Sequence, residues 1–324
     1  MRRSIIRAIT IALSSLAPFA APLASQVPAS VPTVASTPGP DTTPARDTAA
    51  NHPVVHECDA AKAEWIFCDD FETDRLGRYF EYSHRDSSFE RADSVGVLGS
   101  SGMRVQFRKG QVDAGSLKIA FGRTPSSYMR AVDSGATVYR EIYWRVYLRN
   151  DSTWTGGGGD KLSRALSLAS PEWAEAMGAP VWSSGAAFPG AYHLAIDPFS
   201  GTDSDGTLRT TKYNDFQHLR WLGAVRGRTP IFDQSHVGKW YCVEAHVRLN
   251  SPGQNDGVFE LWIDDWLEAR HSELNWVGQF TSYGLNAVFF ENYWNAGSPV
   301  AQNRYLDNIV VSTRRIGCGR LIAP

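Results

Sequence analysis

The stretch from Gly238 to Asp265 carries the side chains in this chain that are best suited to ligand chemistry. It reads as two strands joined by a Pro-Gly-Asn-Asp-Gly turn, and its first strand alternates between an apolar and a polar face. The polar face gathers aromatic, acidic, imidazole and basic side chains: Trp240, Cys242, Glu244, His246 and Arg248. We expect this face to be wet and to suit a polar ring such as a sugar, because aromatic faces pack on C–H groups.

A second strand, Val138–Arg149, has a similar composition. Its apolar positions predict a buried face: Val138, Ile142, Trp144, Val146 and Leu148. The opposite face alternates tyrosines with charges: Tyr139, Glu141, Tyr143, Arg145, Tyr147 and Arg149. We interpret it as a platform for sugar rings; the alternative is an ordinary exposed sheet face with cross-strand pairs.

Segments with period-two alternation recur along the chain and predict the elements that position these side chains. The expected strands are Glu64–Phe71, Met103–Phe107, Val138–Arg149, Tyr192–Ile196, Trp240–Leu249, Val258–Ile263, Ala287–Glu291 and Tyr305–Ser312. Gly, Pro, Asn and Asp lie between them, and only Ser170–Met177 suggests a short helix. Many strands with turn signals predict an all-β antiparallel sandwich.

The first 55 residues are expected to lie outside the folded domain. Residues 1–25 have the charged, apolar and small-residue order of a signal peptide, and residues 26–55 form a Pro/Thr/Ala-rich flexible linker. The domain itself is assigned to residues 56–324. No later apolar run reaches the roughly 18 residues of a membrane span. We expect a secreted or periplasmic protein.

Four cysteines, an even number, predict two disulfides in an exported domain. Antiparallel pairing of the first and last strands would join Cys58 to Cys318 and leave Cys68 with Cys242. A local link between Cys58 and Cys68 is the alternative. No pair has C-x-x-C spacing, which disfavours a zinc site or thioredoxin-like chemistry.

The charge balance restricts the possible partners. The formal charge is −2, and removal of Arg2, Arg3 and Arg7 with the signal leaves −5. Such a chain has no overall field that attracts nucleic acid or an anionic membrane, so local basic side chains must hold any anionic ligand. We expect a monomer.

Five segments together resemble a known family. They are Tyr143–Leu148, the GGGGDKL loop Gly156–Leu162, the hairpin Trp240–Asp264, Phe289–Pro299 and Tyr305–Thr313. The chain resembles concanavalin A-like jelly rolls and, within them, the polysaccharide lyases of alginate, glucuronan and heparin lyase type. The resemblance implies an antiparallel β-sandwich that cleaves an acidic, uronic-acid glycan by β-elimination.

A lyase of this kind neutralises the carboxylate on C5, removes the C5 proton and protonates the leaving glycosidic oxygen. Under this resemblance Arg145 is the candidate neutraliser, with Asn292 assisting. Tyr293 is the candidate base or acid, and Trp294 beside it is a candidate sugar contact. The reaction requires no redox cofactor.

Several further residues are candidates for the same site. His193, His246 and Lys161, which follows the four-glycine loop, are candidate catalytic groups. The remaining candidates would contact substrate: Tyr139, Tyr143, Tyr147, Glu244, Gln217 and His218.

The same residues could serve two other functions. A glycoside hydrolase would need a carboxylate pair, which Glu244 with Glu141 or with Glu291 would supply. A non-catalytic carbohydrate-binding domain would use the same aromatic faces without turnover.

Acidic residues at the two ends of the domain predict a structural calcium ion. Asp70 and Glu72 end the first strand, and Asp307 begins the last. These ends meet in jelly rolls of this kind, and carboxylate oxygens suit Ca²⁺.

Overall fold

The computed structural model describes residues 53–183 and 192–319. The chain divides into Met1–Thr43 and Pro44–Pro324, and every described residue belongs to the second unit. The expected signal peptide and all but three residues of the expected linker therefore lie outside the described residues. Within the described ranges, no helix is long and apolar enough to cross a membrane.

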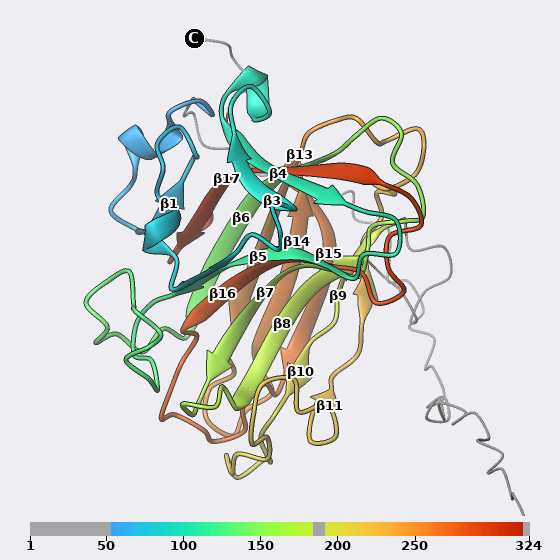
Figure 1. Cartoon of the computed structure of the whole chain (residues 1–324). Helices are drawn as coiled ribbons and strands as arrows, with labels where there is room; N and C mark the ends of the chain where they lie inside the picture. Colours follow the sequence, from blue (N-terminus) through green and yellow to red (C-terminus); the bar gives the residue numbers. More distant parts are fainter. Residues whose placement is uncertain (1–52, 184–191, 320–324) are drawn as a thin grey trace, which may run out of the picture. The chain divides into compact units, whose positions relative to one another are not determined.

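One antiparallel sheet is built around the central strand β6 and is called the β6 sheet here (Figure 1). Strand β1 (Trp65–Asp69) pairs with β17 beside the main order. That order is β15 (Trp266–Leu274), β14 (Gly257–Ile263), β13 (Tyr241–Arg248), β6 (Glu141–Asn150), β17 (Gln302–Ser312), β4 (Gly102–Phe107) and β3 (Phe89–Ala92).

The second sheet is called the β7 sheet and packs against the first. Its main order is β11 (Arg220–Trp221), β10 (Phe199–Ser200), β8 (Glu175–Ser183), β7 (Lys161–Leu168), β16 (Ala287–Tyr293), β5 (Asp113–Ala120) and β2 (Glu81–Ser83). Strand β9 (Leu194–Ile196) pairs with β8, and β12 (Val225–Arg226) pairs with β9. The only helices in the described ranges are the 3-10 turns η1 (Glu57–Ala60), η2 (Leu76–Arg78) and η3 (Val97–Gly99).

The core between the sheets follows from the alternation within each strand. Four of the apolar side chains expected on β6 are buried there: Ile142, Trp144, Val146 and Leu148. They meet inward-facing residues of the β7 sheet, and the Trp144 indole donates to Ser163 Oγ at 3.0 Å. The observed architecture confirms the predicted antiparallel jelly-roll sandwich.

The outer face of the β6 sheet is not the wet surface that the sequence predicts. Glu244 accepts hydrogen bonds from the amides of Ile316 at 2.7 Å and Gly317 at 3.0 Å, so the chain after β17 covers it. Glu244 is consequently buried, and His246 is buried between Glu141 and Glu260. Period-two alternation separates two faces, but it does not tell which segment returns to cover the second one.

Two disulfides tie these covering segments to the sandwich. Cys58 bonds to Cys68, and Cys242 on β13 bonds to Cys318. The expected number is confirmed, and so is the local Cys58–Cys68 link; the pairing of Cys58 with Cys318 is wrong. Turn η1 brings Cys58 back over β1, while the segment after β17 carries Cys318 across to β13.

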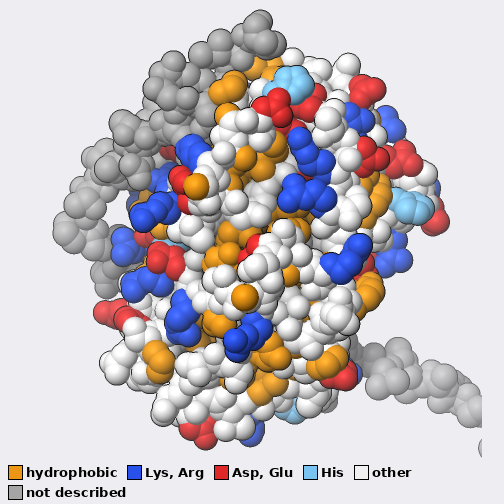
Figure 2. All heavy atoms as spheres, turned by 90° about the vertical axis from the view of Figure 1, so that its left-hand side faces the viewer, with side chains coloured by type: hydrophobic (Ala, Val, Ile, Leu, Met, Phe, Trp, Pro, Cys, Tyr) orange, Lys and Arg blue, Asp and Glu red, His pale blue; other side chains and the backbone are white. Residues whose placement is uncertain are grey.

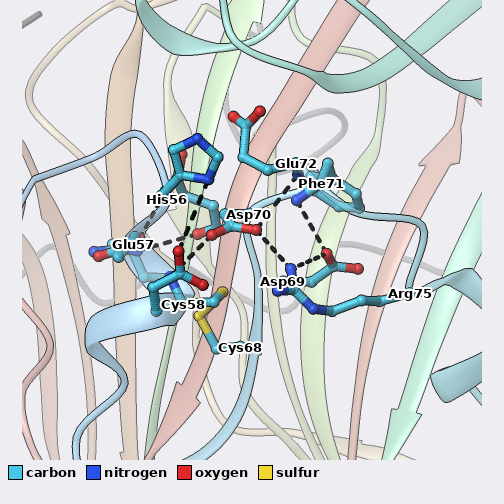
Figure 3. Close-up of a disulfide and its surroundings, with 12 residues drawn as sticks. His56, Glu57, Cys58, Cys68, Asp69, Asp70, Phe71, Glu72 and Arg75 are labelled. Carbon is cyan, nitrogen blue, oxygen red and sulfur yellow. Dashed lines mark hydrogen bonds and ion pairs between the residues drawn. A yellow bond between two sulfur atoms is a disulfide. The ribbon is translucent and has the colours of Figure 1, made fainter. Parts of the chain in front are cut away.

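The three predicted calcium ligands lie near β1 and β17 but have separate partners. Asp70 accepts from the Cys58 amide at 2.9 Å and pairs with Arg75 at 2.6 Å (Figure 3). Asp307 accepts from the Val97 amide at 2.7 Å. Figure 3 shows the Glu72 carboxylate pointing away from Asp70. Because Asp70 already has a cation beside it, the full three-carboxylate set does not fit a calcium ion.

Of the three residues, Glu72 and Asp307 are still predicted to bind calcium. Burial raises the pKa of Asp307 well above its ordinary value, and Glu72 adds to the rise. A cation between the two carboxylates would relieve this repulsion. We expect EDTA to lower the melting temperature of the wild type and to leave Asp307→Asn unchanged. An unchanged wild-type melting curve would show that protein donors alone satisfy Asp307.

Charged side chains are mixed on the face that carries β1. Figure 2 shows Lys and Arg side chains interspersed with Asp and Glu and with hydrophobic patches on that face. No single basic field of the kind that binds nucleic acid is visible there. Any selective recognition of an anion therefore depends on a local cluster.

Candidate active site

A cluster of ionisable side chains lies on the face of the β7 sheet that points away from the core. Lys161 of β7 stands opposite Trp182 of β8 and Tyr293 of β16 in the strand register. Their neighbours Leu162 and Val181 belong to the core. Since side chains alternate along a strand and directly opposed residues share a face, the three project together from the outer face.

Lys161 is held between a carboxylate and an aromatic ring. Its Nζ lies 3.6 Å from Glu291 Oε1 and 4.5 Å from the centre of the Tyr293 ring. Burial lowers the pKa of Lys161, and the charge of Glu291 offsets this only in part. A lysine with a lowered pKa has a larger neutral fraction near pH 7, which allows it to accept a proton.

Glu291 links Lys161 to a second proton-carrying group, Tyr213. The Tyr213 hydroxyl donates to Glu291 Oε1 at 3.1 Å, and Arg164 Nε lies 2.8 Å from Glu291 Oε2. Burial alone would raise the pKa of Glu291, but Arg164 and Lys161 outweigh it and hold that pKa below its ordinary value. Burial also raises the pKa of Tyr213 well above its ordinary value, so the phenol stays protonated.

Asn214 and Glu175 complete the cluster around Arg164. Asn214 Oδ1 accepts from Arg164 Nη1 at 3.1 Å, which identifies the amide oxygen and leaves Nδ2 as a donor. The Asn214 backbone has a positive φ of 56°, a conformation that asparagine tolerates better than most residues. The backbone N–H of Asn214 donates to Glu175 Oε2 at 2.9 Å.

The charge of the cluster depends on whether Glu175 is neutral. Burial raises the pKa of Glu175 to about 7, although Arg164 acts in the opposite direction. Below that pH, Arg164 compensates the single charge of Glu291, and neutral Lys161 adds no charge. An acid and a base with pKa values shifted in opposite directions thus stand in a site without net negative charge, which does not repel an anionic substrate.

Glu175 makes a specific contribution to pH-dependent stability. Its pKa is about 7 in the folded protein and 4.5 ordinarily, so between these values the folded state binds more protons than the unfolded state. Stability from this group is therefore full below pH 4.5 and is lost as the pH rises through 7. We expect Glu175→Gln to remove a decline of about 3 kcal/mol in the free energy of unfolding. Denaturant unfolding of the wild type and of Glu175→Gln between pH 4.5 and pH 7 tests this prediction, and the exposed Glu172→Gln is the control. If the free energy of unfolding falls equally with pH in the wild type and in Glu175→Gln, the prediction is wrong.

Arg145, the neutraliser predicted from the sequence, lies on the other sheet. Its side chain is 0% exposed, pairs with Glu57 and donates to the carbonyl of Gly317 at 3.0 Å. A polysaccharide in solvent therefore has no access to it. This burial corrects the expectation that Arg145 faces a ligand, because residues before β1 and after β17 cover it.

The predicted tyrosine platform is also divided by its surroundings. Tyr139 donates to Asp133 at 2.8 Å, and Tyr147 is buried beside Arg145. The Tyr143 ring stacks on His246 with centroids 4.1 Å apart. These three tyrosines face protein groups and do not form one open surface.

His246 and Glu244 belong to the β6 sheet rather than to the cluster. His246 contacts Glu260 at 2.7 Å and Glu141 at 2.8 Å, which satisfies both ring nitrogens. Glu244 is buried under the segment after β17, whereas Glu291 lies on the β7 sheet. The carboxylate pair that a hydrolase would take from Glu244 and Glu291 is therefore split between the two sheets.

The other predicted histidines lie at the margins of the β7 sheet. His193 precedes β9; burial lowers its pKa, and Arg226 adds to the effect. His218 contacts Asp215 at 2.9 Å in the loop that also carries Tyr213. His218 and its neighbour Gln217 are exposed.

The segment from Glu291 to Trp294 reaches the cluster only in part. Tyr293 supports Lys161, as described above. Asn292 points inward and donates to the Gly115 carbonyl at 3.3 Å, and Trp294 stacks on Trp154 in the core. The glycine loop before Lys161 is likewise packed: a Cβ on Gly158 would lie 2.4 Å from Phe232.

Lys161 and Tyr293 are the candidate catalytic residues that the structure brings together. Arg164, Glu175, Tyr213 and Asn214 are members of the cluster that the sequence did not indicate. Arg164 lies after a β-bulge between Lys161 and Ser163, which breaks the alternation of β7. Tyr213 and Asn214 come from an irregular loop, which has no periodic signal.

The two-sheet architecture places the chain in the class of concanavalin A-like jelly rolls. It is similar to the endo-β-1,4-glucuronan lyase of the fungus Trichoderma reesei, with a TM-score of 0.51 and 11% identity over 77% of this chain and 96% of that one. It is also similar to a marine alginate lyase from Aplysia kurodai, with a TM-score of 0.50 and 13% identity over 78% of this chain and all of that one. No family model matches the sequence, and no curated protein matches it.

Proposed function

We propose that this protein is a secreted or periplasmic polysaccharide lyase that cleaves a uronic-acid glycan by β-elimination. One observation carries the proposal. Lys161 and Tyr213 contact the same oxygen, Glu291 Oε1, at 3.6 and 3.1 Å, and their pKa values are shifted in opposite directions. Two disulfides support a location outside the cytoplasm.

The proposed reaction uses neutral Lys161 as the base. Lys161 Nζ takes the proton from C5 of the uronate, and the electron pair of the broken C–H bond forms the C4–C5 double bond. The glycosidic C4–O bond breaks, and its oxygen takes the proton of the Tyr213 hydroxyl. Proton exchange with solvent then restores the neutral lysine and the phenol.

The substrate carboxylate needs a partner before the C5 proton becomes acidic. Asn214 Nδ2 supplies a hydrogen bond, because Arg164 orients the amide by occupying Oδ1. Arg164 itself stays paired with Glu291 and contributes charge rather than direct contact. Tyr293 positions Lys161 through its ring face.

Product analysis separates this function from hydrolysis. Mass spectrometry of digests of alginate and glucuronan is expected to show oligosaccharides lacking the elements of one water molecule relative to hydrolysis products. Saturated products would indicate a glycoside hydrolase. Intact polymer would favour the second candidate, described next.

A non-catalytic carbohydrate-binding domain is the second candidate, and the exposed aromatic residues favour it. Tyr128, Phe216 and Trp221 are all exposed, and each lies on β11 or on a loop attached to the β7 sheet. Such rings bind sugars without chemistry. Retardation on polysaccharide gels without new products would support this function.

A further inference from the structure

The outer face of the β7 sheet continues past Lys161 into a strip of aromatic rings. Trp182 stands directly opposite Lys161 in the strand register. Trp221, on β11, has its ring centre 5.9 Å from that of Trp182 and 5.3 Å from that of Phe199. We call Trp182, Phe199 and Trp221 the tryptophan strip. It begins beside Lys161, the proposed base, and ends at β11, the first strand in the order of the β7 sheet.

The strip is a supported surface with one open ring. Trp221 is 42% exposed, whereas Phe199 beneath it is fully buried. Phe199 lies directly over Gly178, where a Cβ would stand 2.1 Å from its ring. Glycine at this position therefore allows Phe199 to approach the sheet and to support the Trp221 indole.

Trp182 is fixed by its polar edge, which leaves its ring for packing. Its indole N–H donates to Asp197, a half-buried carboxyl whose pKa burial raises to about 6. The strip has no charge of its own, so it would contact the C–H face of a sugar rather than a carboxylate. Lys161, the proposed base, and Arg164, which contributes positive charge, lie one strand away on β7.

We propose that the tryptophan strip is a subsite that holds a sugar unit of the same acidic glycan, next to the unit at Lys161. This inference rests on the proposed function. The strip runs from β8 over β10 to β11, and Lys161 lies on the neighbouring β7, so the polysaccharide chain runs across the strands. Neighbouring strands are about 4.8 Å apart, so only a chain of several sugar units reaches from Lys161 to Trp221.

Trp221→Ala tests the subsite, and Trp266→Ala is a matched control. Trp266 is also 42% exposed, but it begins β15 of the β6 sheet. On polymeric alginate or glucuronan we expect Trp221→Ala to raise KM about five- to tenfold with little change in kcat. Trp221→Phe should retain most of the affinity, and the shortest cleavable oligosaccharides should not respond to either variant.

Binding measured without turnover separates this inference from the proposed function. In a Lys161→Ala background, gel retardation on alginate and glucuronan should weaken with Trp221→Ala and not with Trp266→Ala. That result supports the subsite even where wild-type protein releases no product. Equal KM and equal retardation for the two tryptophan variants would overturn the subsite while leaving β-elimination intact. Absence of retardation of the parent protein on both polymers would also overturn it.

Discussion

Replacing Lys161 by alanine is expected to reduce turnover of an acidic polysaccharide by about 10²- to 10⁴-fold. The variant loses the group that accepts the C5 proton, while Arg164 continues to compensate the charge of Glu291 at 2.8 Å. Tyr213→Phe should cause a similar loss, because it removes only the hydroxyl that protonates the leaving oxygen. Initial rates and melting curves of both variants measure chemistry and folding separately.

Lys118→Ala is the matched control for the lysine variant. Both lysine side chains are 14% exposed, and both have a carboxylate and an aromatic ring as neighbours. Lys118 pairs with Glu81 of β2 at 2.5 Å rather than with Glu291, and its replacement should leave most of the activity. Full activity of Lys161→Ala would remove it from the mechanism. A larger loss in Tyr293→Phe than in Tyr213→Phe would make Tyr293 the acid.

Arg145→Met is expected to lower the free energy of unfolding by about 3–5 kcal/mol, with little change in turnover per folded molecule. Glu57 and Arg145 are both 0% exposed and pair with each other. Removing the guanidinium takes the Arg145 charge away from the buried Glu57 carboxylate. Denaturant unfolding gives the stability, and initial rates corrected for the folded fraction give the activity.

Arg149→Met is the control for this stability change. Arg149 lies four residues further along β6 and packs on the Tyr305 ring at 4.4 Å. Its replacement should cost less, and adding Glu57→Gln to Arg145→Met should recover part of the loss. A stable Arg145→Met protein without activity would contradict this account and would restore the catalytic role that the sequence suggests for Arg145.

The strands with clear alternation could be predicted from the sequence because one of their faces lies in the core. Strand β6 is an example: its four apolar positions pack inward as expected. The same alternation does not reveal what covers the other face. Residues around Glu57 and Gly317 come from opposite ends of the domain and bury Arg145 and Glu244, and no local pattern encodes that return.

The strands that carry most of the candidate site were the hardest to predict. Strand β8 was expected to begin as a short helix, since Glu175, Ala176 and Met177 have good helix propensity. Pairing with β7 and β10 makes this segment a strand, because tertiary context overrides local preference. Strand β7 packs side chains on both faces and contains a bulge, so its alternation is hidden.

Ultraviolet absorbance tests the central claim most directly. Wild-type protein would be incubated with alginate, glucuronan, heparan, hyaluronan and pectin, and the C4–C5 double bond formed by β-elimination would be followed by its absorbance. We predict that absorbance rises on at least one of these uronic-acid polymers and that Lys161→Ala reduces the rate by about 10²-fold or more. No rise on any of the polymers, or an equal rise with Lys161→Ala, would contradict the account.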